Sequence, residues 1–112
     1  MIPPDEKIIR KVLNWHSPNV YGKNFAALPT SPGVYVLIAH KCQKDNGFIA
    51  YIGSSANLHN RLKNHEVYKK ISALFWNVRI FFKKTSNFKQ VERCLIRKCL
   101  PEYNIHRYLS ER

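Results

Sequence analysis

Acidic residues are scarce in this sequence. The chain of 112 residues contains 7 Asp and Glu against 19 Lys and Arg, which gives a formal net charge of +12 with histidine neutral. Such an excess on so small a chain attracts polyanions, and nucleic acid is the commonest partner of this kind. The alternative is an ordinary solvated surface, since the basic residues are spread along the whole chain. Charge alone does not decide whether a nucleic acid would be bound or cut.

Long hydrophobic runs are absent as well. No apolar stretch approaches the roughly 18 residues that cross a bilayer, and the first residues do not have the layout of a secretory signal. No segment pairs a basic face with a bulky lipid-seeking face, which argues against a membrane surface as the partner. Hydrophobic residues nevertheless make up 45% of the chain, too many for a disordered basic tail. We therefore expect one soluble, compact domain and no membrane association.

Cysteines are few and are not arranged for metal binding. The three, Cys42, Cys94 and Cys99, form no C-x-x-C pair, so a zinc site built from them is not expected. Free thiols suit a reducing compartment. We therefore expect a cytoplasmic protein, associated with the nucleoid if its source is a bacterium or a phage.

The spacing of apolar residues and helix breakers predicts a mixed fold. Residues 33–39 and 48–53 are nearly continuous apolar, β-rich runs, which is typical of strands buried on both faces, and residues 40–47 join them as a hairpin. Residues 75–83 predict a third strand. Helices are expected over 3–16, over 57–65 with Ser54, Ser55 or Asn57 as cap, and from Ser86 or Asn87 to about Cys99.

Two tyrosines occupy near-equivalent places in the first two strands. Tyr35 lies near the start of the first strand and Tyr51 near the end of the second; a strand tyrosine is most often a packing residue with a hydrated hydroxyl. In an antiparallel pair of strands, the residue numbers of two facing residues always add to the same sum. Tyr35 and Tyr51 lie on the same face of the sheet only if that sum is even. A tight turn at residues 46–47 would make that sum odd. A shared tyrosine site therefore requires a wider loop or a bulge near residues 40–47.

The helix expected over residues 57–65 carries a guanidinium and an imidazole. Arg61 and His65 are four residues apart, so they would share one face of that helix. Arginine offers paired donors to a phosphate, and histidine carries a proton near neutral pH. The pair predicts a phosphate site, with a solvated helix face as the alternative.

One carboxylate of the last helix is placed among apolar residues. Glu92 lies between Phe88 and Ile96 at spacings of four. The alternative is a carboxylate at the rim, paired with Lys89 or Arg93. In so basic a chain, an acid on the core side indicates a metal ligand or a general base. One carboxylate is few for Mg²⁺, but this ion keeps several waters and takes further oxygens from a phosphate.

The segment Pro101-Glu102-Tyr103-Asn104 follows that helix. Its proline would stop the helix, and its tyrosine would pack into the core. Asn104 would hold a phosphate or a catalytic side chain through its amide.

Together these segments resemble the GIY-YIG nuclease family over about Ser31 to Asn104. The name-giving triplets are Gly33-Val34-Tyr35 and Tyr51-Ile52-Gly53, with valine in place of isoleucine in the first. The series is completed, in order, by Ser54, Ser55, Asn57, Leu58, Arg61, Leu62, His65, Glu92, Pro101, Tyr103 and Asn104. Each triplet alone is a weak signal, whereas the whole series in this order is specific.

The resemblance implies an α+β fold, a small three-stranded antiparallel sheet flanked by helices. It implies a nuclease domain at residues 31–112, after a lead-in of helix and loop at residues 1–30. The lead-in helix would pack on the domain or on a second copy through Ile8, Ile9, Val12 and Leu13. A homodimer would let an enzyme with one site cut both strands. In the lead-in loop, the residues expected to contact DNA are Tyr21, Lys23 and Asn24.

The resemblance also implies the chemistry. Members of the family hydrolyse DNA phosphodiesters with one divalent metal, here Mg²⁺ or Mn²⁺ held by Glu92. Tyr35 would be the general base or would position the attacking water, with Tyr51 beside it. Arg61 would stabilise charge on the phosphate, and His65 would assist Tyr35 or orient the water. Because a tyrosine of ordinary pKa, about 10, is a poor base at neutral pH, the nearby metal, Arg61 and lysine side chains would have to favour its phenolate.

DNA, double-stranded or branched, is the expected substrate. Asn104 would anchor the site, and the residues expected to contact DNA are Gly53, Ser54, Ser55, Asn57, Lys63 and Lys69. One alternative is a nucleic-acid-binding module that keeps the fold but does not cleave. Another is a structural protein whose basic surface meets RNA or an acidic partner.

Overall fold

The molecule has three strands and four helices over the residues that the computed structural model describes, 4–16 and 28–104. The strands are β1 (Gly33–His40), β2 (Phe48–Ser55) and β3 (Asn77–Lys84). The helices are α1 (Pro4–Val12), α2 (Leu58–Lys63), α3 (Glu66–Leu74) and α4 (Phe88–Cys99). The predicted DNA contacts of the lead-in loop, Tyr21, Lys23 and Asn24, lie outside the described residues.

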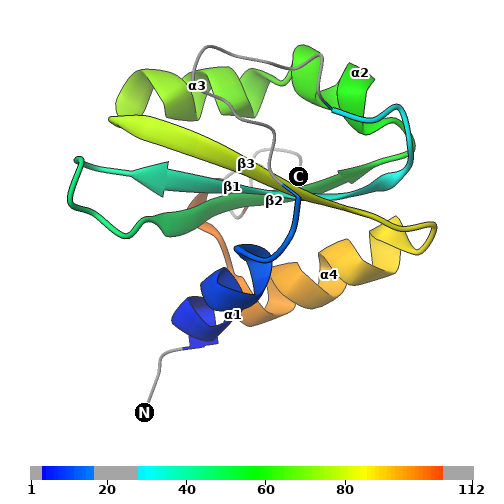
Figure 1. Cartoon of the computed structure of the whole chain (residues 1–112), viewed down its shortest axis with the longest axis horizontal. Coiled ribbons are helices and arrows are strands. Elements are labelled where there is room, and N and C mark those ends of the chain that lie inside the picture. The colour runs from blue at the N-terminus through cyan, green and yellow to red at the C-terminus, as the bar shows by residue number, and fades with distance from the viewer. Residues whose placement is uncertain (1–3, 17–27, 105–112) are drawn as a thin grey trace, which may run out of the picture.

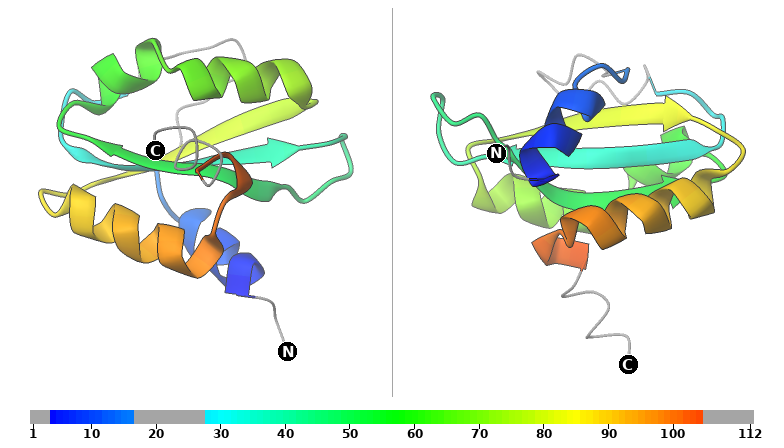
Figure 2. Two further views of the ribbon diagram at one scale, coloured as in Figure 1. Left: turned by 180° about the vertical axis from the view of Figure 1, so that it is seen from behind. Right: turned by 90° about the horizontal axis from the view of Figure 1, so that it is seen from below.

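The strands form one antiparallel sheet in the order β2-β1-β3. Helices α2 and α3 cover one face of it, and α1 and α4 cover the other (Figure 1). Seen from below, α4 runs along the β2 side of the sheet, with α1 beside it (Figure 2). The predicted α+β class and three-stranded antiparallel sheet flanked by helices are therefore confirmed.

β1 is the central strand, and all eight of its residues are buried. Its even-numbered residues from Val34 to Ile38 pack in the cluster shared with α1 and α4. Its odd-numbered residues from Tyr35 to Ala39 pack in the cluster shared with α2 and α3. The strand lies between two apolar layers, so its continuous apolar sequence is explained and the prediction of burial on both faces is confirmed.

A bulge interrupts the β1–β2 ladder. Leu37 pairs with Tyr51, but the next residue, Ile38, pairs with Ile49, which leaves Ala50 as the extra residue of β2. From Leu37–Tyr51 to Gly33–Ser55, the residue numbers of each facing pair add to an even sum. Tyr35 and Tyr51 therefore lie on the same face of the sheet. The predicted need for a bulge or a wider loop is confirmed.

The hairpin connection before β2 is held by Asp45. Its carboxylate accepts hydrogen bonds from the backbone N–H of Lys41 at 2.8 Å and of Gly47 at 3.1 Å. These two bonds lower the pKa of Asp45 below its ordinary value. The contribution of Asp45 to stability is therefore present above the pKa that it has when unfolded, and is lost as the pH falls through its folded pKa. Gly47 takes a left-handed backbone conformation, with φ of 92°.

α1 is shorter than the helix predicted over residues 3–16. Ile8, Ile9 and Val12 pack in the cluster with α4, but Leu13, also predicted to pack, is 42% exposed. The reason lies in the next contact of the chain. The N–H of Phe82 donates to the carbonyl of His16 at 2.8 Å, so the chain leaves the helix to pair with the edge of β3.

α3 was not predicted from the sequence. Its Tyr68 and Ile71 are buried in the cluster that also contains residues of α2. The segment carries helix signals of its own, with Glu66 in the first turn and buried apolar residues three positions apart. The N–H of Phe75 donates to the carbonyl of Ile71 at 3.1 Å and closes the helix. The third strand consequently begins at Asn77, two residues later than predicted.

Among the described residues, no helix combines the length and the apolar character needed to cross a membrane.

Candidate active site

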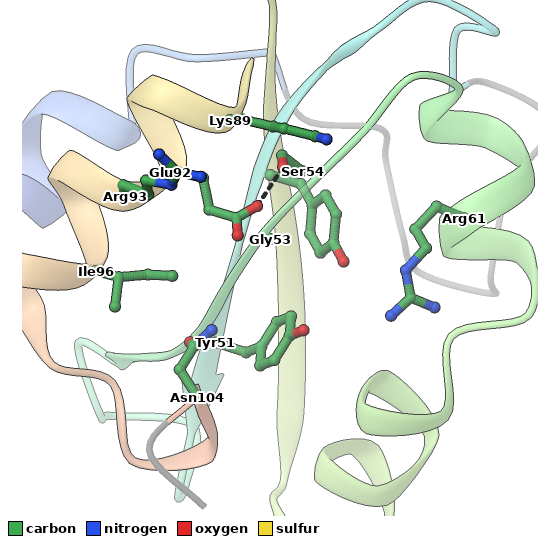
Figure 3. Close-up of a pocket in the computed structure, with 10 residues that line it drawn as sticks. Tyr51, Gly53, Ser54, Arg61, Lys89, Glu92, Arg93, Ile96 and Asn104 are labelled. Carbon is green, nitrogen blue, oxygen red and sulfur yellow. Dashed lines mark hydrogen bonds between the residues drawn. The ribbon is translucent and has the colours of Figure 1, made fainter. Parts of the chain in front are cut away.

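A pocket of ≈ 430 Å³ opens at the β2 edge of the sheet, between α4 and α2 (Figure 3). This β2-edge pocket is lined by Tyr35, Tyr51, Gly53, Ser54, Arg61, Lys89, Glu92, Arg93, Ile96 and Asn104. The lining includes every residue predicted to act in catalysis except His65, which lies against Tyr35 in the interior. Side chains from β1, β2, α2 and α4 thus meet in one place.

The two tyrosines lie on one face of the sheet. Tyr35 is opposite Gly53, and Tyr51 is opposite Leu37. Their ring centroids are 6.2 Å apart and the ring planes differ by 28°. A Cβ atom on Gly53 would collide with Cζ and Oη of Tyr35. Glycine at this position therefore lets the Tyr35 ring lie across β2 toward the pocket.

His65 is not on the helix that carries Arg61, so the predicted shared helix face is wrong. α2 ends at Lys63, and His65 is the N-cap of α3 with extended backbone. Its side chain is fully buried, which also excludes a solvated helix face. The predicted single helix is divided because Nδ1 of His65 accepts the N–H of Tyr68 at 3.0 Å, and this cap begins a new helix.

The cap also determines where the imidazole carries its hydrogen. Because Nδ1 accepts the Tyr68 N–H, the neutral ring has its hydrogen on Nε2. Nε2 lies 2.6 Å from Oη of Tyr35, so we assign the histidine as the donor and the tyrosine oxygen as the acceptor. The ring of Tyr51 packs edge-on against the same imidazole, with centroids 5.1 Å apart. Tyr35 is therefore held by a buried and fixed hydrogen-bond donor.

Glu92 reaches the pocket from the opposite layer. It lies on α4, and its half-buried carboxylate extends toward the β2 edge, where the hydroxyl of Ser54 donates a hydrogen bond to Oε2 (Figure 3). Within residues 4–16 and 28–104, neither Lys89 nor Arg93 forms an ion pair with this carboxylate. The alternative of a rim carboxylate paired with one of these residues is therefore wrong.

Arg61 forms the wall of the pocket across from α4. It lies on α2, is partly exposed, and turns its guanidinium toward the hydroxyl of Tyr51 (Figure 3). A positive charge and the carboxylate of Glu92 thus stand on opposite sides of two phenols. An arrangement of this kind can bind a phosphate and offer it both a cation and a metal ligand.

Asn104 holds the outer edge of β2. Its Oδ1 accepts the N–H of Ile52 at 2.7 Å, and its Nδ2 donates to the carbonyl of Ile52 at 2.7 Å. Both groups of Ile52 point out of the sheet, where a further strand would pair, so the amide takes the place of a strand neighbour. The contact anchors the segment after α4 to β2. The amide oxygen of Asn104 is already bonded to the N–H of Ile52. Tyr103 beside it stacks edge-on against Phe75, as its predicted place in the core requires.

The residues predicted to contact DNA are divided by the structure. Gly53 and Ser54 line the pocket. Ser55 and Asn57 form the turn before α2. Lys63 and Lys69 are exposed and lie outside the pocket lining. The Ser55 hydroxyl bonds both the N–H and the carbonyl of Asn57 at 3.0 Å, and Asn57 caps α2. For Ser55 and Asn57 the geometry supplies a structural role, and contact with DNA stays a prediction.

Lys89 and Arg93 line the pocket, although the sequence indicated them only as partners of Glu92. Their distance from Glu92 along α4 was visible in the sequence. What was not visible is that the β2 edge lies across from this part of the helix, so that side chains beside Glu92 also face the pocket.

Candidate metal-binding side chains other than Glu92 are few among the described residues. The described residues contain no group of three His, Cys, Asp or Glu side chains that could surround a metal ion. The three cysteines are free thiols, as predicted.

No family model matches the sequence. Two curated relatives are similar to it, both named UvrABC system protein C. The one from Caldicellulosiruptor saccharolyticus is 30% identical over 94 residues, which cover 74% of this chain and 14% of the relative. The one from Chlamydia caviae is 30% identical over 89 residues, which cover 70% of this chain and 14% of the relative. This chain therefore spans about 14% of the length of these relatives.

Solved structures of the GIY-YIG N-terminal endonuclease domain of UvrC from Thermotoga maritima have a similar fold. One point mutant, bound to its catalytic divalent cation, is 25% identical with a TM-score of 0.53, covering 87% of this chain and 94% of that chain. A second point mutant is 23% identical with the same TM-score of 0.53, over 87% of this chain and 94% of that chain.

We predict that Asn104→Ala lowers stability. The substitution leaves the buried N–H and carbonyl of Ile52 without their partner, and an unsatisfied buried group costs about 1–3 kcal/mol. The free energy of unfolding, measured by urea denaturation, should fall by at least that amount, with Asn60→Ala on the exposed side of α2 as the control. Unchanged stability together with lost activity would mean that the amide acts on a substrate instead.

Proposed function

This chain belongs to the GIY-YIG family, and from that membership we propose that it is a divalent-metal-dependent endonuclease that hydrolyses phosphodiester bonds in DNA. One observation carries the proposal. The β2-edge pocket joins two phenols, a guanidinium and a carboxylate that come from four separate elements. Packing alone gives no reason for these four polar groups to converge in one open pocket.

Glu92 suits a divalent metal ion such as Mg²⁺ or Mn²⁺. Carboxylate oxygens are preferred ligands of these ions, and the hydrogen bond from Ser54 fixes the orientation of the carboxylate. With one carboxylate, the remaining positions fall to waters and to oxygens of the phosphate. When bound, the ion would neutralise charge on the phosphate and make a bound water more acidic. The related T. maritima domain that carries a catalytic divalent cation supports this assignment.

Tyr35 is the residue proposed to orient or deprotonate the attacking water. A phenolate accepts hydrogen bonds more strongly than a phenol does, so the N–H of His65 favours the charged form of Tyr35. His65 holds a hydrogen on Nε2 already and cannot take the hydroxyl proton there. It assists Tyr35 as a fixed donor, without contacting the water.

Arg61 is proposed to stabilise the negative charge that develops on the phosphate during attack. Its guanidinium faces the pocket before substrate arrives, so little reorganisation is needed in the transition state. Tyr51 lies between Arg61 and the carboxylate side of the pocket, where its hydroxyl can meet a phosphate oxygen.

DNA is the proposed substrate, double-stranded or branched. The net charge of +12 supports a polyanionic partner, and the similarity to an endonuclease domain supports a nucleic acid among the polyanions. A homodimer that would cut both strands stays a prediction.

Metal dependence gives the direct test. The purified protein should nick or cut plasmid and branched DNA with Mg²⁺, stop with EDTA, and recover with excess Mg²⁺. Glu92→Gln keeps the side-chain shape but removes the charge, so cleavage should be lost while DNA binding remains. The matched control is Glu102→Gln, an exposed acid outside the pocket. Binding without any product, in Mg²⁺ or Mn²⁺, would instead select the non-cleaving module.

Ser54→Ala should weaken the metal site without abolishing it. Removing a group that orients a metal ligand costs about 10- to 100-fold in metal affinity or activity. The Mg²⁺ concentration for half-maximal cleavage should rise by that factor, and saturating Mg²⁺ should restore most of the rate. Ser55→Ala, at the neighbouring hydroxyl, should leave the Mg²⁺ dependence unchanged. A normal Mg²⁺ titration in Ser54→Ala would refute the orienting role.

His65→Asn separates the two contacts of the histidine. Asparagine is a good N-cap, so α3 should keep its start, but its shorter side chain cannot reach Tyr35. A hydrogen bond to a charged group is worth about 1.5–3 kcal/mol, which corresponds to a loss of about 10- to 100-fold in kcat. Single-turnover rates should show this loss with KM nearly unchanged and with a wild-type circular dichroism spectrum. Wild-type kcat would show that Tyr35 does not depend on His65.

A further inference from the structure

Two basic residues of α4 lie between two hollows. Lys89 and Arg93 line the β2-edge pocket, and both also line a second hollow of ≈ 480 Å³ at the start of the helix. The rest of this α4 hollow is formed by Ser86, Asn87, Phe88 and Gln90. The two hollows therefore adjoin each other, and the side chains at their shared border are cationic.

The positive charge at this border is not neutralised by neighbouring side chains. Glu92 is the one acid of α4, and its carboxylate bonds to Ser54. Among the residues that the structure describes, none forms an ion pair with Lys89 or Arg93. Both side chains are exposed, and the side chain of Lys89 extends from α4 toward the pocket that it lines together with Ser54 (Figure 3).

Further lysines are exposed outside both hollows. β3 ends with the exposed Lys83 and Lys84, a few residues before the α4 hollow begins. On the opposite side of the β2-edge pocket, the exposed Lys63 and Lys69 do not belong to the lining. Apart from Arg61, the basic side chains that line the pocket are therefore those of Lys89 and Arg93 on α4.

We propose that a DNA strand leaves the β2-edge pocket across α4, and that Lys89 and Arg93 bind the phosphates next to the one held between Arg61 and Glu92. This inference rests on the proposed function of the pocket. Lysine binds a phosphate as a point charge, and arginine through paired N–H donors, so the two suit successive phosphates of one strand. The α4 hollow takes the nucleotides on that side of the scissile bond.

Binding measurements without metal test this path. Fluorescence anisotropy of labelled duplex DNA in EDTA, over a series of salt concentrations, compares wild type with the double variant Lys89→Ala/Arg93→Ala. The double variant Arg97→Ala/Lys98→Ala is the control, since it removes equal charge from the same helix at exposed positions outside both hollows. The slope of log K against log salt concentration should fall by about 0.9 for each phosphate that the variant no longer binds. Equal slopes for the two double variants would overturn the proposal.

Neutral phosphates locate the binding positions on the strand. Single methylphosphonates are placed on either side of the scissile position in a synthetic duplex. We expect substitutions on one side to weaken binding by wild type and by the control variant, and to have no further effect on Lys89→Ala/Arg93→Ala. If the same substitutions weaken binding by all three proteins equally, Lys89 and Arg93 bind elsewhere and the proposal is wrong.

The outcome is separable from that of the endonuclease proposal, because the salt dependence of binding is measured in EDTA and needs no cleavage. Protein that binds DNA through Lys89 and Arg93 but never cuts it would refute the endonuclease and keep the path. Normal cleavage with an unchanged salt slope in Lys89→Ala/Arg93→Ala would refute the path and keep the endonuclease.

Discussion

The pairing of β1 with β2 is the constraint on which the site depends. A shift of one residue in a strand pair moves every side chain to the other face of the sheet. Here the extra residue Ala50 shifts the register of the strand pair by one residue. Tyr51 therefore lies on the same face of the sheet as Tyr35. Gly53 then removes the one Cβ that would collide with the Tyr35 ring. Without the bulge, Tyr51 would face α1 and α4, and the two phenols would be separated by the sheet.

The site lies at an edge because its groups come from both layers. α2 and α4 are on opposite faces of the sheet and can approach each other only around one of its edges; both helices contact β2, so they meet at the β2 edge. Arg61 reaches the edge from one layer and Glu92 from the other. Asn104 satisfies the outward backbone groups of Ile52 there, which blocks the addition of a further strand at that point and leaves the neighbouring part of the edge open. An extended polyanion such as a DNA strand can then lie along an open pocket that no fourth strand covers.

The sequence predicted most of the fold and part of the site. The parity of Tyr35 and Tyr51, with the need for a bulge, followed from strand geometry, and the residue series of the resemblance named most of the residues that line the pocket. The helix boundary at His65 was missed because an imidazole that caps a helix looks like a helix-surface residue. Leu13 was wrongly predicted to pack in the core, because helical periodicity gives no sign that the segment after it pairs with β3. Lys89 was missed since spacing along one helix does not reveal what lies opposite it.

Hydrolysis by this site requires one metal ion and one phosphate to meet within the β2-edge pocket. The most direct measurement is anomalous diffraction from crystals of the protein with Mn²⁺ and a DNA duplex whose scissile linkage resists hydrolysis. The account predicts an anomalous peak bonded to the Glu92 carboxylate, with the scissile phosphate between that peak and Arg61 and with Tyr35 facing the phosphorus. Mn²⁺ bound away from Glu92, or a phosphate backbone that passes outside the pocket, would contradict it.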